Sequence, residues 1–341
     1  MHFRLHGRLV ESRLPGRCLE GNALGDPAER DVLVYLPPGH DEGTRRYPTV
    51  MLLPGFAATH RSMVAWSPWK RSTVETFDDQ IVRGETAPAI LVMPDATTRF
   101  GGSQFLDSPA TGNYQSYLVD EVVPHVDATF RTIAEASGRG VAGRSSGGFG
   151  ALRLATDRPG TFAAIGAHAA DASFDVTMRP MLTHAAIAIG RAGGLEAFAR
   201  RVVDGGPRDA MEFDAIFTLA ASCAYAPDGD APYPHCALPF DVRTGRIDEG
   251  AFARWRAHDP LERIAVSHDA LRSLRYAIVD AGDRDEHGLQ LAAREVAEAL
   301  RAAKVRVEHD EFEGGHRGTS WRYALTLPKL VAALTPEGAA P

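Results

Sequence analysis

The stretch V-A-G-R-S-S-G-G-F-G at residues 141–150 decides the fold of this chain. It begins as an apolar strand, passes through the pattern G-x-S-x-G and continues as a helix. A strand that reverses directly into a helix brings two backbones together, and glycines at positions 143 and 147 leave room for that approach. The pattern predicts a strained turn with positive φ at Ser145, which holds the hydroxyl clear of both elements. Residues 141–150 are therefore interpreted as a nucleophile elbow.

Because a five-residue pattern can arise by chance, this interpretation depends on whether suitable partners follow. The backbone N–H of Ser146, at the start of the helix, is expected to face an oxyanion. A second amide is expected from the loop after the apolar run at 47–53, since that loop faces the elbow in this architecture. Phe56 is the predicted second donor, and Ala57 is the alternative.

A serine nucleophile needs a general base and an acid that orients the base. His316 follows two glycines after the last predicted strand and is the expected base. The acid is expected in the turn at 280–286, which gives the chain order serine, acid, histidine. Asp285, at the tip of that turn, is the preferred acid. The other candidates are Asp280, expected to brace the turn, and Asp283 and Glu286, which stay open.

Apolar runs alternating with helical patterns predict an α/β fold with a mainly parallel central sheet and helices on both faces. The expected strands are 31–38, 47–55, 88–93, the elbow strand, 162–167, 274–279 and 305–312. The expected helices outside the insertion are 113–130, the elbow helix, 287–304 and 321–334.

The alternation stops between residues 171 and 264, where helical patterns at 195–203, 210–224 and 251–257 surround a Pro/Gly/Asp loop. The predicted organisation is a catalytic core of residues 1–170 and 265–341, with residues 171–264 as a helical cap insertion. Open α/β sheets place ligands at their carboxyl edge, so the cap is expected to lie there. The alternative is a separate helical domain without contact to the site.

The composition is that of an ordinary globular protein, with 44% hydrophobic and 24% charged residues in a chain of 341. A net charge of −7 without a run of Lys or Arg predicts no nucleic-acid or anionic-membrane partner, and favours a small-molecule ligand. No segment has the length of a membrane span, and the first residues lack the apolar stretch of a signal peptide. Oligomeric state, including a homo-oligomer, stays open.

Three cysteines, Cys18, Cys223 and Cys236, are expected to be free thiols in a reducing compartment, which predicts a cytoplasmic protein. A disulfide between Cys223 and Cys236 is the alternative. No metal site is expected, because H-E-x-x-H is absent and the histidine and cysteine pairs lack further ligands. No cofactor is expected either, since the glycines near residue 143 are not followed by Lys-Ser or Lys-Thr.

Seven motifs in chain order carry a family resemblance: V-Y-L-P-P-G (34–39), R-R-Y-P-T-V-M-L-L-P-G-F (45–56), F-L-D-S-P-A-T-G-N-Y (105–114), F-R-T (130–132), G-R-S-S-G-G (143–148), D-A-G-D-R-D (280–285) and G-G-H (314–316). Together they resemble the putative-esterase family of α/β-hydrolases, which includes esterase D-type S-formylglutathione hydrolases, feruloyl esterases, siderophore esterases and antigen 85 mycolyltransferases. The resemblance implies the α/β-hydrolase fold.

The resemblance also implies roles for individual residues: Ser145 as nucleophile, His316 as base, Asp285 as acid, and Phe56 and Ser146 as amide donors. In the mycolyltransferase branch the acid is a glutamate slightly further on, which keeps Glu286 open. The chain departs from the family in two ways. Many relatives are secreted, whereas no signal peptide is seen here, and the insertion is longer than in compact members, so substrate identity does not carry over.

The expected activity is therefore that of a serine carboxylic-ester hydrolase that works through an acyl-enzyme on a small-molecule ester. Two alternatives remain: an acyltransferase that uses the same acyl-enzyme, and a catalytically silent module that binds a ligand on the same fold. Candidates for the lining of the substrate pocket are Ser103, Asp107, Trp66 and Trp69.

Overall fold

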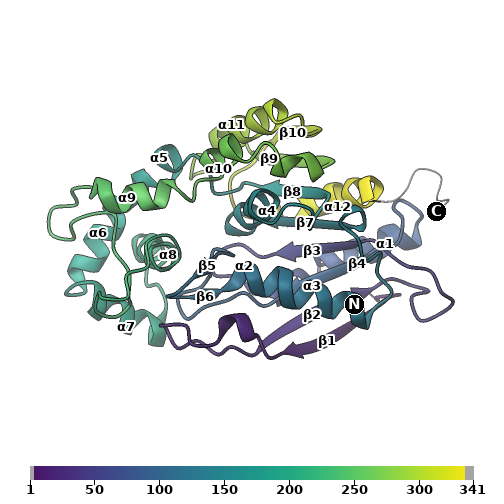
Figure 1. The fold of residues 1–341 in the computed structure, drawn as a ribbon, viewed down its shortest axis with the longest axis horizontal. Helices are drawn as coiled ribbons and strands as arrows, with labels where there is room; N and C mark the ends of the chain where they lie inside the picture. Colours follow the sequence, from purple (N-terminus) through teal and green to yellow (C-terminus); the bar gives the residue numbers. More distant parts are fainter. Residues whose placement is uncertain (1–3, 335–341) are drawn as a thin grey trace.

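A computed structural model describes residues 4–334, and its centre is one eight-stranded sheet between two layers of helices (Figure 1). The strands of the sheet are β1 (Arg8–Leu14), β2 (Arg30–Leu36), β3 (Thr49–Leu53), β4 (Ile90–Pro94), β7 (Arg139–Arg144), β8 (Ala164–His168), β9 (Tyr276–Gly282) and β10 (Val307–Phe312). Their order is β1-β2-β4-β3-β7-β8-β9-β10. From β4 to β10 all neighbours are parallel, and β2 is antiparallel to both of its neighbours. The predicted mainly parallel sheet is confirmed.

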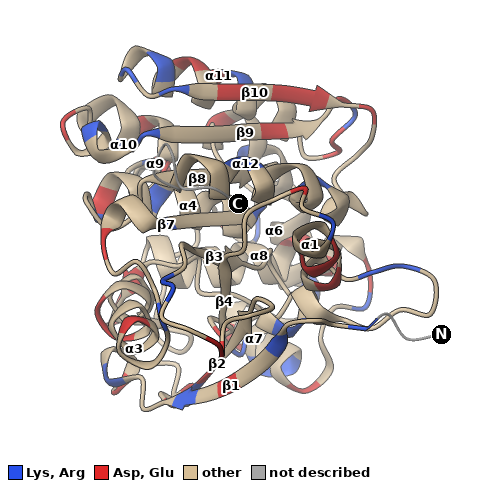
Figure 2. Cartoon of the chain, turned by 90° about the vertical axis from the view of Figure 1, so that its right-hand side faces the viewer, with Lys and Arg blue, Asp and Glu red and all other residues tan. Residues whose placement is uncertain are grey.

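The apolar runs of the sequence became strands because they are buried on both faces of the sheet. β3, β4 and β8 contain no Lys, Arg, Asp or Glu, whereas the edge strands β1 and β10 carry several charged side chains (Figure 2). Charged, half-exposed edges are typical of strands that must not pair with another chain. The alternation in R-L-V-E-S-R-L is interrupted by charge, and sequence reasoning missed β1 for that reason.

Two hydrophobic clusters hold the helical layers against the sheet. One face is covered by α2 (Tyr114–Ser116), the π-helix η3 (Tyr117–Val122), α3 (Val123–Thr129), α4 (Ser146–Asp157), α10 (Pro260–Val266) and α11 (Leu289–Ala302). The opposite face is covered by α1 (Thr73–Val82) and α12 (Arg322–Leu334). Successive strand residues alternate between the clusters, as the period of a strand requires: Leu33 and Tyr35 face α1 and α12, while Val32 and Val34 face the other layer.

The helix predicted at 113–130 is present, but its middle is a π-helix. Pro124 lies just after this π-helix and has no N–H to donate to the preceding turn, so the regular hydrogen-bond ladder cannot run through it. The four side chains expected on the core side, Tyr117, Leu118, Val122 and Val126, are all buried.

Beyond the ends of the parallel strands lie five helices that we call the cap (Figure 1). They are α5 (Phe174–Thr177), α6 (Leu182–Arg191), α7 (Leu195–Gly205), α8 (Ala210–Tyr225) and α9 (Glu249–Arg256). A third hydrophobic cluster, around Phe198, Leu219, Tyr225 and Trp255, fills the cap and also includes Phe149 of α4. The cap therefore has a core of its own that touches the sheet domain at the elbow helix.

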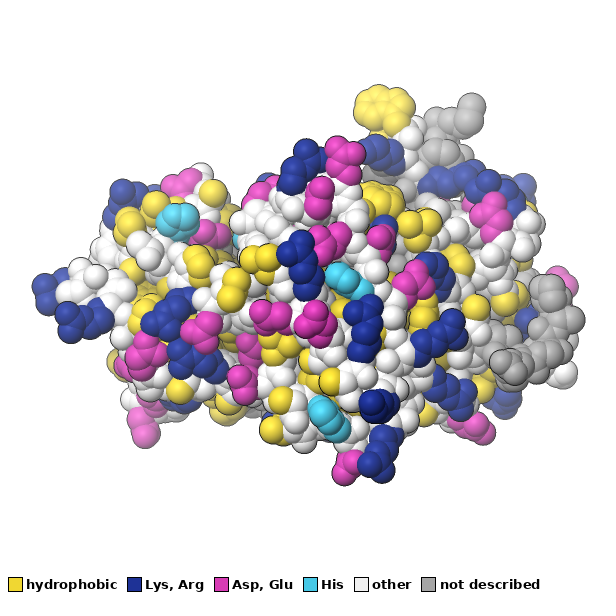
Figure 3. Space-filling model, turned by 90° about the horizontal axis from the view of Figure 1, so that it is seen from above, with side chains coloured by type: hydrophobic (Ala, Val, Ile, Leu, Met, Phe, Trp, Pro, Cys, Tyr) yellow, Lys and Arg dark blue, Asp and Glu magenta, His cyan; other side chains and the backbone are white. Residues whose placement is uncertain are grey.

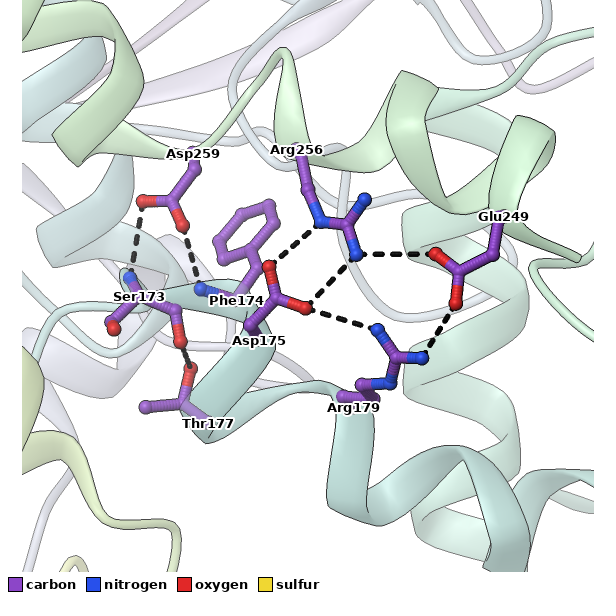
Figure 4. Close-up of polar contacts among 8 residues, drawn as sticks. All are labelled: Ser173, Phe174, Asp175, Thr177, Arg179, Glu249, Arg256 and Asp259. Carbon is purple, nitrogen blue, oxygen red and sulfur yellow. Dashed lines mark hydrogen bonds and ion pairs between the residues drawn. The ribbon is translucent and has the colours of Figure 1, made fainter. Parts of the chain in front are cut away.

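Two sets of polar contacts fasten α5 to the rest of the cap (Figure 4). Asp175 on α5 pairs with Arg256 and Arg179, and both arginines also pair with Glu249 at the start of α9. The hydrogen bonds from Arg256 and Arg179 outweigh partial burial and hold the pKa of Asp175 below its usual value. Behind this ring, the buried Asp259 carboxylate accepts the Phe174 N–H at 2.6 Å and the Ser173 N–H at 3.1 Å.

On the face seen in Figure 3, acidic and basic side chains are interspersed rather than gathered into a field of one sign. Short 3₁₀ helices (Arg17–Leu19, His60–Val64, Ala136–Gly138, Arg179–Met181, Ala270–Ser273 and Thr319–Trp321) and the β5–β6 ribbon (Asp107–Ser108 with Gly112–Asn113) complete the architecture. Within residues 4–334, no helix combines the length and the apolar character that crossing a bilayer requires.

Candidate active site

Ser145 lies at the apex of the elbow, between β7 and α4, with φ 57° and ψ −123°. The positive φ matches the strained turn that the sequence predicts. The glycines around it are required by contact: a Cβ on Gly143 would lie 2.3 Å from the Gly147 carbonyl oxygen, and a Cβ on Gly147 would lie 2.1 Å from the Leu53 carbonyl oxygen. The elbow is thus pressed between the ends of β3 and β7, and Ser145 stands at the carboxyl edge of the sheet.

The imidazole of His316 and the carboxylate of Asp285 meet at the same edge, in the loops after β10 and β9. His316 Nδ1 is 2.8 Å from Asp285 Oδ2, and the Asp285 side chain is fully buried. Burial opposes ionisation of Asp285, but the hydrogen bond from His316 and the imidazole charge outweigh it and lower the pKa of that carboxyl group. With Nδ1 donating to Asp285, Nε2 is left as the nitrogen that can accept a proton. The His316 carbonyl oxygen accepts from Arg144 Nη1 at 2.7 Å, which ties this loop to the elbow.

The other acidic residues of the turn have different partners. Glu286 accepts the backbone N–H of His316 at 2.7 Å, and Asp283 accepts that of Gly314 at 2.9 Å, so both shape the histidine loop. Asp280 is buried behind the site, where it binds His168 Nδ1 and Arg322 Nε, each at 2.8 Å. Among the four candidates, Asp285 is the one whose carboxylate contacts the imidazole of His316.

The backbone at residues 55–57 approaches the elbow closely. A Cβ on Gly55 would lie 3.6 Å from Ser145 Cβ, and the Phe56 ring packs edge-on against Phe213 and Phe217 of α8. The alternative donor, Ala57, already donates its N–H to the Gly101 carbonyl oxygen at 2.9 Å. Because the Ala57 N–H is already used, this contact favours Phe56 over Ala57 as the second oxyanion donor beside the Ser146 amide.

A second carboxyl group, which sequence reasoning missed, stands beside the nucleophile candidate. Asp171 Oδ1 is 3.4 Å from Ser145 Oγ, and its Oδ2 accepts the Ser146 hydroxyl at 3.0 Å. Burial raises the pKa of Asp171 to about 6, although the imidazole charge of His316 and the two hydroxyls oppose this shift. A signal was present in the sequence: Asp171 follows the strand next to the elbow strand, so it had to emerge at the same edge.

These groups open into one cavity of about 400 Å³ beneath the cap. Ser145, Asp171 and His316 lie in its wall with Arg144, Arg317, His287 and Asp214. The rest of the wall is mostly apolar and is formed by Phe56, Thr177, Met178, Met181, Phe213, Phe217 and Leu289. A cavity with one apolar side and the reacting groups on the other suits an ester that has an apolar acyl or alcohol group.

The structure does not bring the four predicted lining residues to this cavity. Ser103 is buried and accepts the Phe105 N–H, and Asp107 accepts the N–H and hydroxyl of Ser116, so both stabilise local turns. Trp66 and Trp69 lie on the surface, 60% and 86% exposed, outside the cavity wall. Opposite the groups at the sheet edge, the cavity is lined by residues in and beside α5 and α8, whose positions depend on the packing of these helices over the sheet.

Ligand-type side chains also gather away from the cavity, where atoms of Glu11, Asp31 and His60 lie within 4.8 Å of one another. Each carboxylate already has a cationic partner: Asp31 accepts from Arg13 at 2.7 Å, and Glu11 pairs with Arg61. Two guanidinium groups therefore already neutralise the two carboxylates of this cluster. The three cysteines are free thiols, with Cys223 and Cys236 buried in the cap.

Comparison with known proteins agrees with this architecture. The family model described as "Putative esterase" matches residues 22–330. Esterase Rv1288 of Mycobacterium tuberculosis is 28% identical over 322 residues, which is 89% of this chain and 56% of that protein. The chain thus spans about half the length of the curated relatives it matches.

Solved structures resemble the chain over almost its whole length. A ferulic acid esterase superposes with a TM-score of 0.61 at 18% identity, covering 96% of this chain and 99% of its own. An S-formylglutathione hydrolase from Agrobacterium tumefaciens gives a TM-score of 0.57 at 16% identity, covering 97% of each chain. At these identities the likeness concerns the fold, which is that of the α/β-hydrolases.

Proposed function

The chain belongs to the putative-esterase family, and from that premise we propose that it is a serine carboxylic-ester hydrolase with Ser145, His316 and Asp285 as its catalytic triad. One observation carries the proposal: the His316 imidazole, held by Asp285 at 2.8 Å, shares a cavity with the hydroxyl at the apex of the elbow. That is the arrangement a serine needs in order to lose its proton as it attacks.

In the proposed first half-reaction, Ser145 Oγ attacks the ester carbonyl carbon while His316 Nε2 takes the hydroxyl proton. Asp285 holds the imidazole in the required tautomer and stabilises its cationic form. The carbonyl oxygen becomes an oxyanion that accepts the N–H groups of Phe56 and Ser146. When the tetrahedral intermediate collapses, the carbon–oxygen bond to the alcohol breaks, and His316 returns the proton to the leaving oxygen.

The second half-reaction repeats these steps with water as nucleophile. His316 takes a proton from a water molecule that attacks the acyl-enzyme, and the bond to Ser145 Oγ breaks. The proton then goes to that oxygen, and the carboxylic acid leaves. The substrate would present its apolar group to Phe213, Phe217 and Met178, because these side chains form the apolar wall opposite the elbow.

Hydrolysis of nitrophenyl esters, from acetyl to long acyl chains, tests the proposal. We expect the parent protein to hydrolyse them and Ser145→Ala to lower the turnover number by about 10⁴-fold or more. The chain-length optimum would measure the acyl side of the cavity. A fluorophosphonate probe provides an independent readout, since it should label Ser145 stoichiometrically in the parent protein and leave Ser145→Ala unlabelled. Esterase activity that survives in Ser145→Ala would overturn the assignment.

A further inference from the structure

The turn that presents Asp171 is built at the expense of backbone strain. Ala169 and Ser173, on either side of it, have φ of 42° and 53°, a region that residues other than glycine seldom occupy. The turn also lies directly on the elbow helix, because a Cβ on Gly148 would come within 2.9 Å of Ala170 Cβ. The strained turn and its close packing on α4 together fix the Asp171 carboxyl group beside the two serines.

The partners of this carboxyl group are hydroxyls rather than cations. Asp171 is 3% exposed, and within residues 4–334 the side chains that donate hydrogen bonds to its carboxylate are two serine hydroxyls, with no Lys or Arg among them. Its oxygens are shared between the Ser146 hydroxyl at 3.0 Å and the Ser145 hydroxyl at 3.4 Å. Burying a carboxylate that is not paired with a Lys or Arg costs free energy, and the ionised group is a strong hydrogen-bond acceptor.

Several other charged or titratable groups face Asp171 or share its cavity. They are Arg144 beside the elbow, Asp285 and His287 in the loop after β9, His316 and Arg317 in the loop after β10, and Asp214 and Tyr225 on α8.

Ser145 has a single hydroxyl proton, which it can donate either to Asp171 or to the base. We propose that Asp171 is a positioning residue that holds the Ser145 hydroxyl away from His316 when its carboxyl group is ionised and releases it when the carboxyl group is protonated. This inference rests on the proposed role of Ser145 as nucleophile. It adds a built-in pH response: the Asp171 carboxylate restrains the reaction on the alkaline side, and the restraint is lost when the carboxyl group is protonated.

The test compares the parent protein with Asp171→Asn between pH 5 and 9. The asparagine keeps the shape and can still bond to Ser146, but it carries no charge at any of these pH values. Two rates are measured at each pH: the labelling of Ser145 by a fluorophosphonate, and kcat/KM for nitrophenyl acetate. We expect the ratio of variant to parent to lie near one at pH 5 and to rise to about five- to tenfold at pH 8, with a midpoint near pH 6, since burial raises the pKa of Asp171 to about 6.

A structural role alone would change both rates by a factor that does not depend on pH, so a flat ratio overturns the inference. A ratio that falls with rising pH overturns it as well, because it would mean that the carboxylate assists the reaction. Asp175→Asn is the matched control. Asp175 lies four residues further on and is paired with two arginines that keep its pKa low, so its charge does not change in this range and its ratio should be flat.

Folding of each variant is checked by circular dichroism and thermal unfolding, and Asp171→Ser replaces Asp171→Asn if the latter does not fold. Labelling by the fluorophosphonate distinguishes a failure of the proposed function from a failure of the role proposed for Asp171. If the parent protein does not react at Ser145, the proposed function fails and this inference fails with it. If Ser145 reacts but the ratio is flat, only the role of Asp171 is wrong.

Discussion

At the scale of single residues, the hydrogen bond between Asp285 Oδ2 and His316 Nδ1 separates the candidate acids. Replacing Asp285 by Asn should favour the wrong imidazole tautomer and lower kcat about 10³- to 10⁴-fold. Glu286→Gln is the matched control, because its amide oxygen can still accept the His316 N–H and the expected loss is tenfold or less. Steady-state kinetics on a nitrophenyl ester measure both. An equal loss in the two variants would contradict the assignment of Asp285.

Asp171 also makes a prediction about stability. Its pKa is about 6 in the folded protein, against an ordinary value of 3.8, so the folded state binds this proton more tightly than the unfolded state. As the pH rises from about 4 to about 6, the free energy of unfolding of the parent protein should therefore fall relative to that of Asp171→Asn. Above about pH 6 the difference should stay constant. The change should amount to at most about 3 kcal/mol, at 1.36 kcal/mol per pKa unit.

Urea unfolding of both proteins at pH 4, 6 and 8 would measure this change. Hydrogen bonds lost in the variant change its unfolding free energy by the same amount at every pH, so the pH dependence of the difference can still be measured. A difference in unfolding free energy that is the same at all three pH values would show that folding does not raise the pKa of Asp171.

The triad candidates could be predicted from the sequence because each depends on its position next to a strand. Ser145 needs an elbow, and His316 and Asp285 need loops after late strands. Asp171 was missed because the chain around it reads as the start of an insertion. The lining residues failed for a different reason: Ser103 and Asp107 were chosen from a loop rich in polar residues, but such side chains serve the turns of that loop. Only tertiary packing decides which side chains face a cavity.

At the scale of elements, the elbow makes the sharpest prediction. In Gly147→Ala the new methyl group would lie 2.1 Å from the Leu53 carbonyl oxygen, so β3 or α4 must move. We expect the free energy of unfolding to fall by about 3 kcal/mol or more. Gly205→Ala, at the end of α7, meets no atom within 4 Å and should leave stability unchanged or raise it by up to about 1 kcal/mol. Thermal or urea unfolding compares the two, and equal losses would contradict the packing described for the elbow.

The strands most faithfully predicted from sequence are those buried on both faces, since their apolar runs have no other explanation. β1 and α1 were missed because each is partly exposed and charged. For α1 a signal existed: Ser72 and Glu75 form a capping box in which each side chain accepts the backbone N–H of the other residue. Three further helices were missed: α5 and α10 are short, and α6 is mostly apolar.

At the scale of the whole molecule, the attachment of α5, which covers part of the cavity, is the feature to test. Asp259 is buried and accepts three backbone N–H groups, including two at the start of α5, so Asp259→Ala should lower the free energy of unfolding by about 2–3 kcal/mol. Arg256→Ala removes contacts between partly exposed groups, and its loss should be about 1 kcal/mol or less.

Because Thr177 and Met178 line the cavity, Asp259→Ala should also raise KM more than it lowers kcat. Thermal unfolding and ester kinetics on the two variants measure these effects. A larger loss of stability in Arg256→Ala than in Asp259→Ala would show that the exposed ion pairs, rather than the buried carboxylate, hold α5 in place.

The division of apolar packing among three clusters has a consequence for the history of such a protein. The strands before the triad candidates pack between the clusters on the two faces of the sheet, whereas Met178 and Phe217 of the cavity wall belong to the cluster inside the cap. We expect substitutions inside the cap cluster to change the cavity wall more than the strands that carry the reacting groups. Over the evolution of such a protein, substitutions in the cap would then change which substrates fit the cavity, while the residues at the sheet edge keep the same reaction.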